Sequence, residues 1–283
     1  MRNIFLIIIL SINITTNLKA QILADTAVLP SFDSAMAMPV SPITAFFQQA
    51  EKITDTEKVT VITKAKKRMS LKQFIVSFYG EVEEATLYAY QGLSDLDGDG
   101  KKELVIWYFS GGDECCDEMY IFKPIGTNIY QHSARMYAGH TAILDNKEFE
   151  YNLHENFSRF FTCYTCFYSD TADTAPIDVS NIRLKYTKGK LYPILTFSEL
   201  KSIINDNLEK LGEVPYTALN ATESDEGIRK EMAINLTAFY YLFGKNAQAT
   251  QQLFFKHYKH PDVKKVWTAY LKQLNFVRRN NDF

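Results

Sequence analysis

After its first 20 residues, the sequence has no long apolar run and no excess of basic charge. A helix needs about 18 or more consecutive apolar residues to cross a bilayer, so we expect no membrane span. The 31 Lys and Arg residues are matched by 33 Asp and Glu residues, for a net charge of -2. Nucleic-acid binding depends largely on clustered positive charge, so we expect no nucleic-acid partner.

The sequence also lacks the short motifs that identify common enzyme classes. It contains no Gly-x-Ser-x-Gly elbow, no phosphate-binding loop, no dinucleotide fingerprint and no His-Glu-x-x-His string. No unit of about twenty to fifty residues is repeated, so the chain does not encode a complete propeller or solenoid. We therefore assign no catalytic residue and no residue that binds an organic cofactor.

The first 20 residues have the pattern of a secretory signal peptide. Arg2 supplies the positive start, residues 4–10 form a short apolar stretch, and a polar segment ends at Ala20. The alternative is an N-terminal helix that stays in the fold, but the apolar stretch is soon followed by polar residues. We expect cleavage near Ala20 and a secreted or periplasmic protein.

Cysteine is scarce, with 4 residues at positions 115, 116, 163 and 166. An exported protein meets an oxidising compartment, where an even number of cysteines indicates disulfides. We expect Cys115 and Cys116 to pair with Cys163 and Cys166 across the two segments. The alternative is a bond between Cys115 and Cys116 together with a local Cys163–Cys166 bond. The strand-like flanks of Cys163 argue against a redox dithiol, and the missing gap in Cys115-Cys116 argues against zinc.

Hydrophobic residues make up 46% of the chain, and their spacing changes along it. We expect an α+β protein in four parts: a signal peptide (1–20), a linker with one helix beginning at Pro42 (21–68), an antiparallel β-rich domain (69–195) and a helical bundle (196–283). Residues 104–109 are apolar throughout, which predicts an interior strand with both faces covered.

Short aromatic and β-branched runs predict strands near 84–90, 103–109, 118–123, 128–136, 147–152, 158–167, 180–187 and 191–195. The C-terminal part instead shows helical spacing, with helices predicted at 196–212, 224–243, 246–258 and 262–277. Thr196 and Glu199 have the spacing of a capping box, and Gly212 and Gly244 are expected to end the first two helices.

The strongest chemical signal is a run of acidic residues and glycines just before residue 104. Calcium takes about six to eight oxygen ligands at about 2.3–2.6 Å, and a loop supplies them by placing carboxylates at alternate positions. The predicted ligands are the side chains of Asp95, Asp97, Asp99 and Glu103 and the backbone carbonyl of Lys101. Glycines 98 and 100 allow sharp turns. Four carboxylates this close repel one another unless a cation lies between them.

The string Asp-Leu-Asp-Gly-Asp-Gly-Lys-Lys-Glu-Leu-Val-Ile, residues 95–106, resembles the calcium loop of FG-GAP and VCBS repeats. Every ligand position of that loop matches, and a hydrophobic strand follows, as in those families. The resemblance covers about 20 residues in a single copy, and it implies a structural calcium ion in a β-hairpin. An EF-hand is excluded because its twelfth position needs a glutamate, and Ile106 stands there.

These patterns predict an exported calcium-binding protein that acts as a non-catalytic binding or structural module, with a protein or a carbohydrate as partner. The alternative is a secreted hydrolase whose site lies on loops at a sheet edge. The residues that line a pocket would discriminate between the binding module and the hydrolase. Several convergent acids, or a histidine with a carboxylate partner, favour the enzyme, and a flat aromatic face favours binding.

Overall fold

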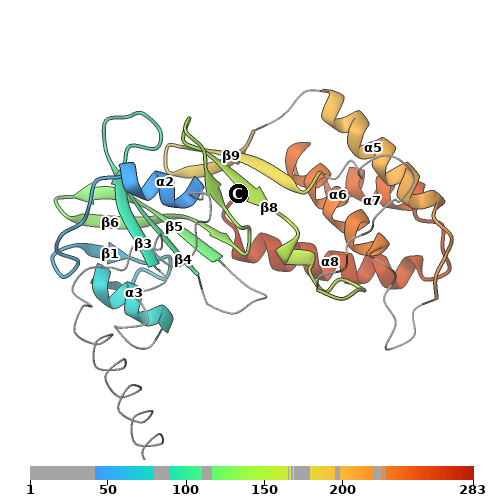
Figure 1. Ribbon diagram of the computed structural model, residues 1–283, viewed down its shortest axis with the longest axis horizontal. Helices are drawn as coiled ribbons and strands as arrows, with labels where there is room; N and C mark the ends of the chain where they lie inside the picture. The colour runs from blue at the N-terminus through green and yellow to red at the C-terminus, as the bar shows by residue number, and fades with distance from the viewer. Residues whose placement is uncertain are drawn as a thin grey trace, which may run out of the picture. The chain divides into compact units, whose positions relative to one another are not determined.

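The computed structural model describes residues 42–79, 89–109, 117–164, 166, 168, 179–194, 198–218, 225 and 227–283. The predicted signal peptide, Cys115, Cys116 and most of the strand expected at 84–90 lie outside these residues. The described part belongs to one compact unit, Ser41–Phe283. It contains two β-sheets followed by a group of helices, which confirms the predicted α+β class (Figure 1).

The first sheet has six strands in the order β2-β1-β6-β5-β4-β3. Its strands are β1 (Thr60–Ile62), β2 (Arg68–Ser70), β3 (Ala89–Ser94), β4 (Glu103–Phe109), β5 (Asp117–Gly126) and β6 (Ile129–Tyr137). All neighbours are antiparallel except β1 and β6, which run parallel, so the predicted antiparallel pairing holds for β3 to β6 and the added strand β1 makes the sheet mixed. Strand β1 also lies in the segment expected to be a linker. It has only 3 residues, too few to show an alternating pattern.

The second sheet has four antiparallel strands in the order β10-β9-β8-β7. Its strands are β7 (Ala142–Ile143), β8 (Glu148–Asn152), β9 (Asn181–Thr187) and β10 (Lys190–Pro193). In β9, the buried Ile182, Leu184 and Tyr186 alternate with exposed residues, as expected for a strand that packs one face on the core. This sheet and β4, β5 and β6 account for six of the predicted strands.

The strand predicted at 158–167 is absent from the described residues there. Instead, a short 3-10 helix, η2 (Glu155–Phe157), is followed by turns. The N–H of Phe160 donates to the carbonyl of Phe157, and Phe161 has a left-handed φ of 56°, so the backbone folds back on itself. Phe157 is buried, and Phe160 and Phe161 pack against the core. Their aromatic character therefore reflects core packing without a strand.

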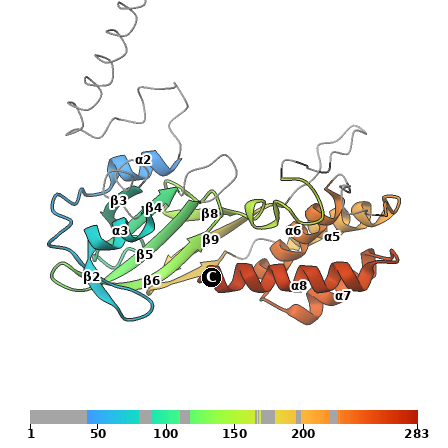
Figure 2. The same cartoon turned by 90° about the horizontal axis from the view of Figure 1, so that it is seen from below.

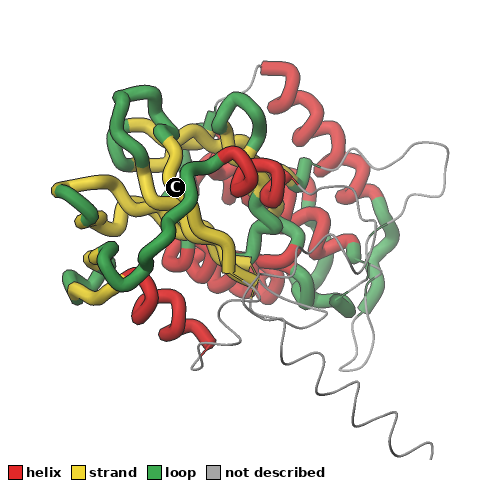
Figure 3. The backbone as a smooth tube through the Cα atoms, turned by 60° about the vertical axis from the view of Figure 1, so that its left-hand side comes forward, coloured by secondary structure: helices red, strands yellow, loops and turns green. Residues whose placement is uncertain are grey.

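Six helices lie in the described residues: α2 (Pro42–Gln49), α3 (Leu71–Tyr79), α5 (Ser198–Glu213), α6 (Ile228–Leu242), α7 (Ala247–His257) and α8 (Val263–Asn280). Figure 2 shows α5 to α8 grouped together, away from α3 and β1 to β6. Figure 3 shows the strands in yellow and the helices in red. None of the described helices combines the length and apolarity that a membrane crossing requires.

Of the two glycines expected to end helices, Gly244 does so and Gly212 does not, while the predicted capping residue Thr196 lies outside the described residues. Gly244, with a φ of 86°, follows α6, and the side chain of Asn246 accepts a hydrogen bond from the Ala249 N–H at the start of α7. Gly212, however, lies inside α5 and does not end it. A Cβ at this position would lie 2.5 Å from the carbonyl oxygen of His257, so glycine permits α5 and the end of α7 to approach closely.

Strand β4 separates two hydrophobic clusters. Leu104 and Ile106 face the smaller cluster under α3, which includes Phe74. Val105, on the opposite face of β4, belongs to the larger cluster, which joins both sheets to α5, α6, α7 and α8. Strand β4 has a neighbour on each side, so the prediction of an interior strand with two covered faces is confirmed. The larger cluster makes the β-rich part and the helices share one core.

Candidate metal centre

The predicted metal loop, residues 95–102, connects β3 to β4, and we call it the acidic loop. The two strands are antiparallel, with Ser94 opposite Glu103, so the loop closes a hairpin as the sequence resemblance implied. Gly98 and Gly100 have left-handed φ values of 76° and 85°. A side chain would meet no neighbour at either position, so the backbone conformation alone requires glycine there.

The acidic loop brings three carboxylates together. One side-chain oxygen from each of Asp95, Asp97 and Asp99 lies within 4.8 Å of the other two, which is close enough for the three to hold one metal ion. The loop backbone helps to aim them. The two oxygens of Asp95 accept hydrogen bonds from Gly98 N at 2.8 Å and Gly100 N at 3.0 Å.

Asp97 carries the clearest sign of an incomplete site. Its Oδ2 accepts a hydrogen bond from the backbone N–H of Lys188 at 2.8 Å. Its Oδ1 is shielded from solvent and has no hydrogen-bond partner among the described residues. A buried carboxylate oxygen without a partner is costly, because it has lost water and gained nothing in return. A bound cation would remove that cost.

Glu103 lies at the base of the acidic loop and is only 3% exposed. Burial raises the pKa of this carboxyl to about 7; the Leu96 N–H, 2.9 Å from Oε2, opposes the rise, and the charges of Asp97 and Asp99 add to it. A nearby cation would favour the ionised form of Glu103. Glu103 is not part of the three-oxygen cluster, and its role as a ligand, like that of the Lys101 carbonyl, stays a prediction.

Two residues that the sequence analysis missed connect the acidic loop to the second sheet. Lys188, in the β9–β10 turn, donates to Asp97, and the ammonium of Lys147, in the β7–β8 turn, donates to the carbonyl of Asp95. Both turn residues have left-handed φ values, 50° for Lys188 and 62° for Lys147. The Lys188-Gly189 dipeptide marked a turn in the sequence, but nothing local indicated that this turn meets the acidic loop.

The predicted cysteine pairing was wrong for the described residues. Cys163 and Cys166 form a local disulfide with an S–S distance of 2.01 Å, so neither can bridge to the segment around residue 115. The buried ammonium of Lys230 in α6 donates to the carbonyls of Tyr164 at 2.9 Å and Cys166 at 3.2 Å. The disulfide closes this short segment, and Lys230 holds the segment against α6.

Comparison with protein-family models, with curated proteins and with solved structures finds no match to this chain. The likeness of the acidic loop to FG-GAP and VCBS loops therefore rests on the sequence string alone. What the geometry adds is a cluster of three aspartates suited to a metal ion, joined by hydrogen bonds to both turns of the second sheet.

Proposed function

We propose that this chain is an exported calcium-binding protein in which the ion serves structure rather than catalysis. The observation that carries the proposal is Asp97, whose buried Oδ1 lacks a partner where three carboxylates meet. The spacing of the acidic residues and the resemblance to FG-GAP and VCBS loops support the same conclusion.

Calcium fits the donor set better than magnesium does. The acidic loop offers three aspartates, the Lys101 carbonyl and Glu103, all of them oxygen donors on a glycine-containing backbone. Calcium accepts about six to eight such oxygens in flexible geometry, whereas magnesium demands near-octahedral geometry and gives up water reluctantly. Soft metals that prefer sulfur or imidazole are disfavoured by a donor set made only of oxygen.

The ion would stabilise the joint between the two sheets. Asp97 and Asp95 each contact a turn of the second sheet through Lys188 and Lys147. Without a cation, mutual repulsion of the aspartates pushes the acidic loop away from the geometry in which these contacts form. Calcium would therefore favour the packed arrangement of the β3–β4 hairpin on the β7–β8 and β9–β10 turns.

Thermal unfolding of metal-stripped protein tests the proposal. Calcium at a hundredfold excess over its Kd should add about 2.7 kcal/mol, because the folded loop binds and the unfolded chain hardly does. The double variant Asp97→Ala with Asp99→Ala should lose this gain. A matched double variant, Asp145→Ala with Asp206→Ala, removes two exposed aspartates outside the acidic loop and should keep it. Identical melting curves in calcium and in chelator would refute the proposal.

Two histidine–carboxylate pairs favour the alternative of a secreted hydrolase. In one of them, Nε2 of His132 lies 3.1 Å from Oδ2 of Asp282, and neither residue lines the cavity described below. In the other, Nε2 of His140 lies 3.0 Å from Oε1 of Glu155, and Glu155 lines that cavity. A histidine with a carboxylate partner was the feature expected of an enzyme. However, Glu155 is the only acidic residue among the described residues that line this cavity. We therefore propose a non-catalytic module.

A further inference from the structure

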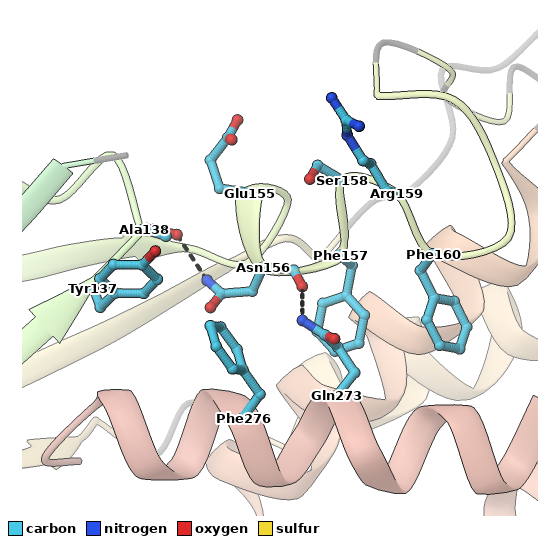
Figure 4. Close-up of a pocket in the computed structure, with 10 residues that line it drawn as sticks. All are labelled: Tyr137, Ala138, Glu155, Asn156, Phe157, Ser158, Arg159, Phe160, Gln273 and Phe276. Atoms are coloured by element: carbon cyan, nitrogen blue, oxygen red, sulfur yellow. Dashed lines mark hydrogen bonds between the residues drawn. The ribbon is translucent and has the colours of Figure 1, made fainter. Parts of the chain in front are cut away.

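A cavity of about 280 Å³ lies between η2, the end of β6 and α8. Figure 4 shows Tyr137 reaching in from β6, Gln273 and Phe276 rising from α8, and Asn156 in η2. No residue of the acidic loop lines it, so it is a separate site. Its volume is slightly below the range of about 300–1,000 Å³ that is usual for small-molecule pockets.

Aromatic rings form the apolar wall of this cavity. The rings of Tyr137 and Phe276 meet nearly edge to face, with centroids 6.0 Å apart and an interplanar angle of 75°. Phe276 is 43% exposed, which is unusual for a large apolar side chain in the described part of the chain. An exposed ring at the mouth of a cavity offers a flat surface on which a ligand can pack.

Asn156 supplies a polar group that lacks a partner. Its residue is only 5% exposed, and its Nδ2 donates to the carbonyl of Ala138 at 2.7 Å and to the hydroxyl of Tyr151 at 2.6 Å. Its Oδ1 has no partner among the described residues, and Figure 4 shows this oxygen facing the ring of Phe276. A modest rotation of the partly exposed Phe276 would uncover an acceptor for a donor on a bound ligand.

The loop that follows the cavity residue Ala138 is held in place by one buried carboxylate. Asp117 is 1% exposed and accepts hydrogen bonds from the backbone N–H groups of Gly139 at 3.0 Å, His140 at 2.8 Å and Thr141 at 2.8 Å. It thereby stabilises His140 in a left-handed conformation, with a φ of 40°. Backbone strain of this kind persists only where the surroundings fix it, and it occurs often at ligand sites.

We propose that this cavity binds one ring of a neutral saccharide. A sugar ring presents C–H bonds that pack on aromatic faces and hydroxyl groups that pair with amides, and the cavity combines the rings of Tyr137 and Phe276 with the amides of Asn156 and Gln273. The lining holds one acid, Glu155, and one arginine, Arg159, so it has no net charge to select an ion. Cleavage of a glycosidic bond ordinarily uses two carboxylates, and this lining provides one, which favours binding.

An array of neutral glycans ending in glucose, galactose, mannose or N-acetylglucosamine tests the proposal on the full chain, and calorimetry then gives the Kd of the best ligand. Phe276→Ala should weaken that ligand by about tenfold, because a stacking ring is lost. Phe276→Tyr keeps the ring and should bind as the parent does. The control is Phe255→Ala in α7, which removes a 37% exposed phenylalanine that does not line the cavity.

Three results would overturn the proposal: no glycan on the array binds, a tyrosine-containing tripeptide binds while every glycan fails, or Phe276→Ala and Phe255→Ala have equal effects. Melting curves of both alanine variants show whether either has lost its fold, and Phe276→Tyr tests the site even if Phe276→Ala unfolds. The double variant Asp97→Ala with Asp99→Ala should retain glycan binding, so failure of the calcium proposal and failure of this one are distinguishable.

Discussion

The β-rich part and the helical part share the larger hydrophobic cluster, yet polar groups are used differently in each. In the β-rich part, the carboxylates of Asp95, Asp97 and Asp117 accept backbone N–H groups and so fix turns. In the helical part, α6 is buried at residues 229–242, where Arg229 is paired with Asp225 and Asp262 and Lys230 donates to backbone carbonyls. The stability of the β-rich part should therefore depend on cations and pH. The stability of the helical part should depend instead on the buried side chain of Arg229.

Of the changes considered, removal of the Arg229 side chain should lower the free energy of unfolding most. The ion pairs that it breaks lie in the helical part. Its guanidinium lies 2.9 Å from Asp225 and 2.9 Å from Asp262, and both Arg229 and Asp225 are almost fully buried. Arg229→Met should cost about 3–5 kcal/mol in urea unfolding, because it leaves a buried carboxylate without its partner. The matched control is Arg183→Met, whose guanidinium is half exposed and 3.8 Å from Glu148, and which should cost about 0–1 kcal/mol. If Arg229→Met and Arg183→Met lower the free energy of unfolding equally, the buried pair is no more important than the exposed one and the prediction is wrong.

Calcium, by contrast, should stabilise the protein, and it should do so through the β-rich part alone. At a hundredfold excess over its Kd, the ion should add about 2.7 kcal/mol, and hydrogen exchange should slow in the acidic loop and in the turns at Lys147 and Lys188. Local opening of α6 should not change, since no helical residue belongs to the aspartate cluster. Slowing that is uniform across the chain would show that the two parts do not respond separately.

Adding one methyl group between α5 and α7 should destabilise the protein by a smaller amount. Alanine normally favours a helix, but at Gly212 the new Cβ would lie 2.5 Å from the His257 carbonyl oxygen. Gly212→Ala should therefore destabilise the protein by about 1–2 kcal/mol, as overpacking does. Gly126→Ala provides the comparison, because its Cβ would meet its nearest neighbour at an ordinary 3.6 Å. Calorimetry that ranks the two variants in the reverse order would contradict the close approach of the helices.

The His140–Glu155 pair should contribute least to the free energy of unfolding, and its contribution should depend on pH. The hydrogen bond to Glu155 raises the pKa of His140 above its ordinary 6.5, against the opposing effect of burial. Burial acts to raise the pKa of Glu155, but hydrogen bonds from His140 and Tyr164 outweigh it and leave this pKa below its ordinary 4.5. The contribution from His140 is complete below pH 6.5 and is lost as the pH rises through the raised value. That from Glu155 is complete above pH 4.5 and is lost as the pH falls through the lowered value.

The cost of His140→Ala should therefore be greatest between about pH 4.5 and 6.5 and should fall on either side. Because the imidazole is 55% exposed, the cost should stay below about 1 kcal/mol. Urea unfolding at several pH values measures it. His260→Ala, which removes an imidazole in contact with the rings of Tyr216 and Tyr258, should show no such maximum.

Features written in local sequence could be predicted, and features set by distant contacts could not. The apolar run in β4, Gly244 after α6 and the alternate aspartates each act within a few residues. By contrast, β1 is recognised only through its pairing with β2 and β6, and β6 lies far away in the sequence. The aromatic residues after η2 were predicted to form a strand because aromatic residues favour strands, whereas in the fold they pack, partly buried, against the core.

The residues of the candidate site also fall into a group that local sequence predicted and a group that it did not. Its three aspartates were predicted from spacing, since a nine-residue motif carries its own turn glycines. The contacts of Lys147 and Lys188 were missed because 52 and 91 residues separate them from their partners. The Cys163–Cys166 bond was named only as the alternative pairing, because the preferred bridges assumed a strand at residues 158–167 that the described residues do not form.

The hydrogen bond from Lys188 to Asp97 has a consequence for the order of events during synthesis. The ligands of the acidic loop leave the ribosome together, but Asp97 acquires its final orientation only when a residue 91 positions later has folded against it. Contacts that span so much chain form late, since loop-closure entropy must be overcome first. Calcium would therefore bind the nascent chain weakly and gain affinity once the β9–β10 hairpin is in place, so that tight binding marks the completion of the second sheet.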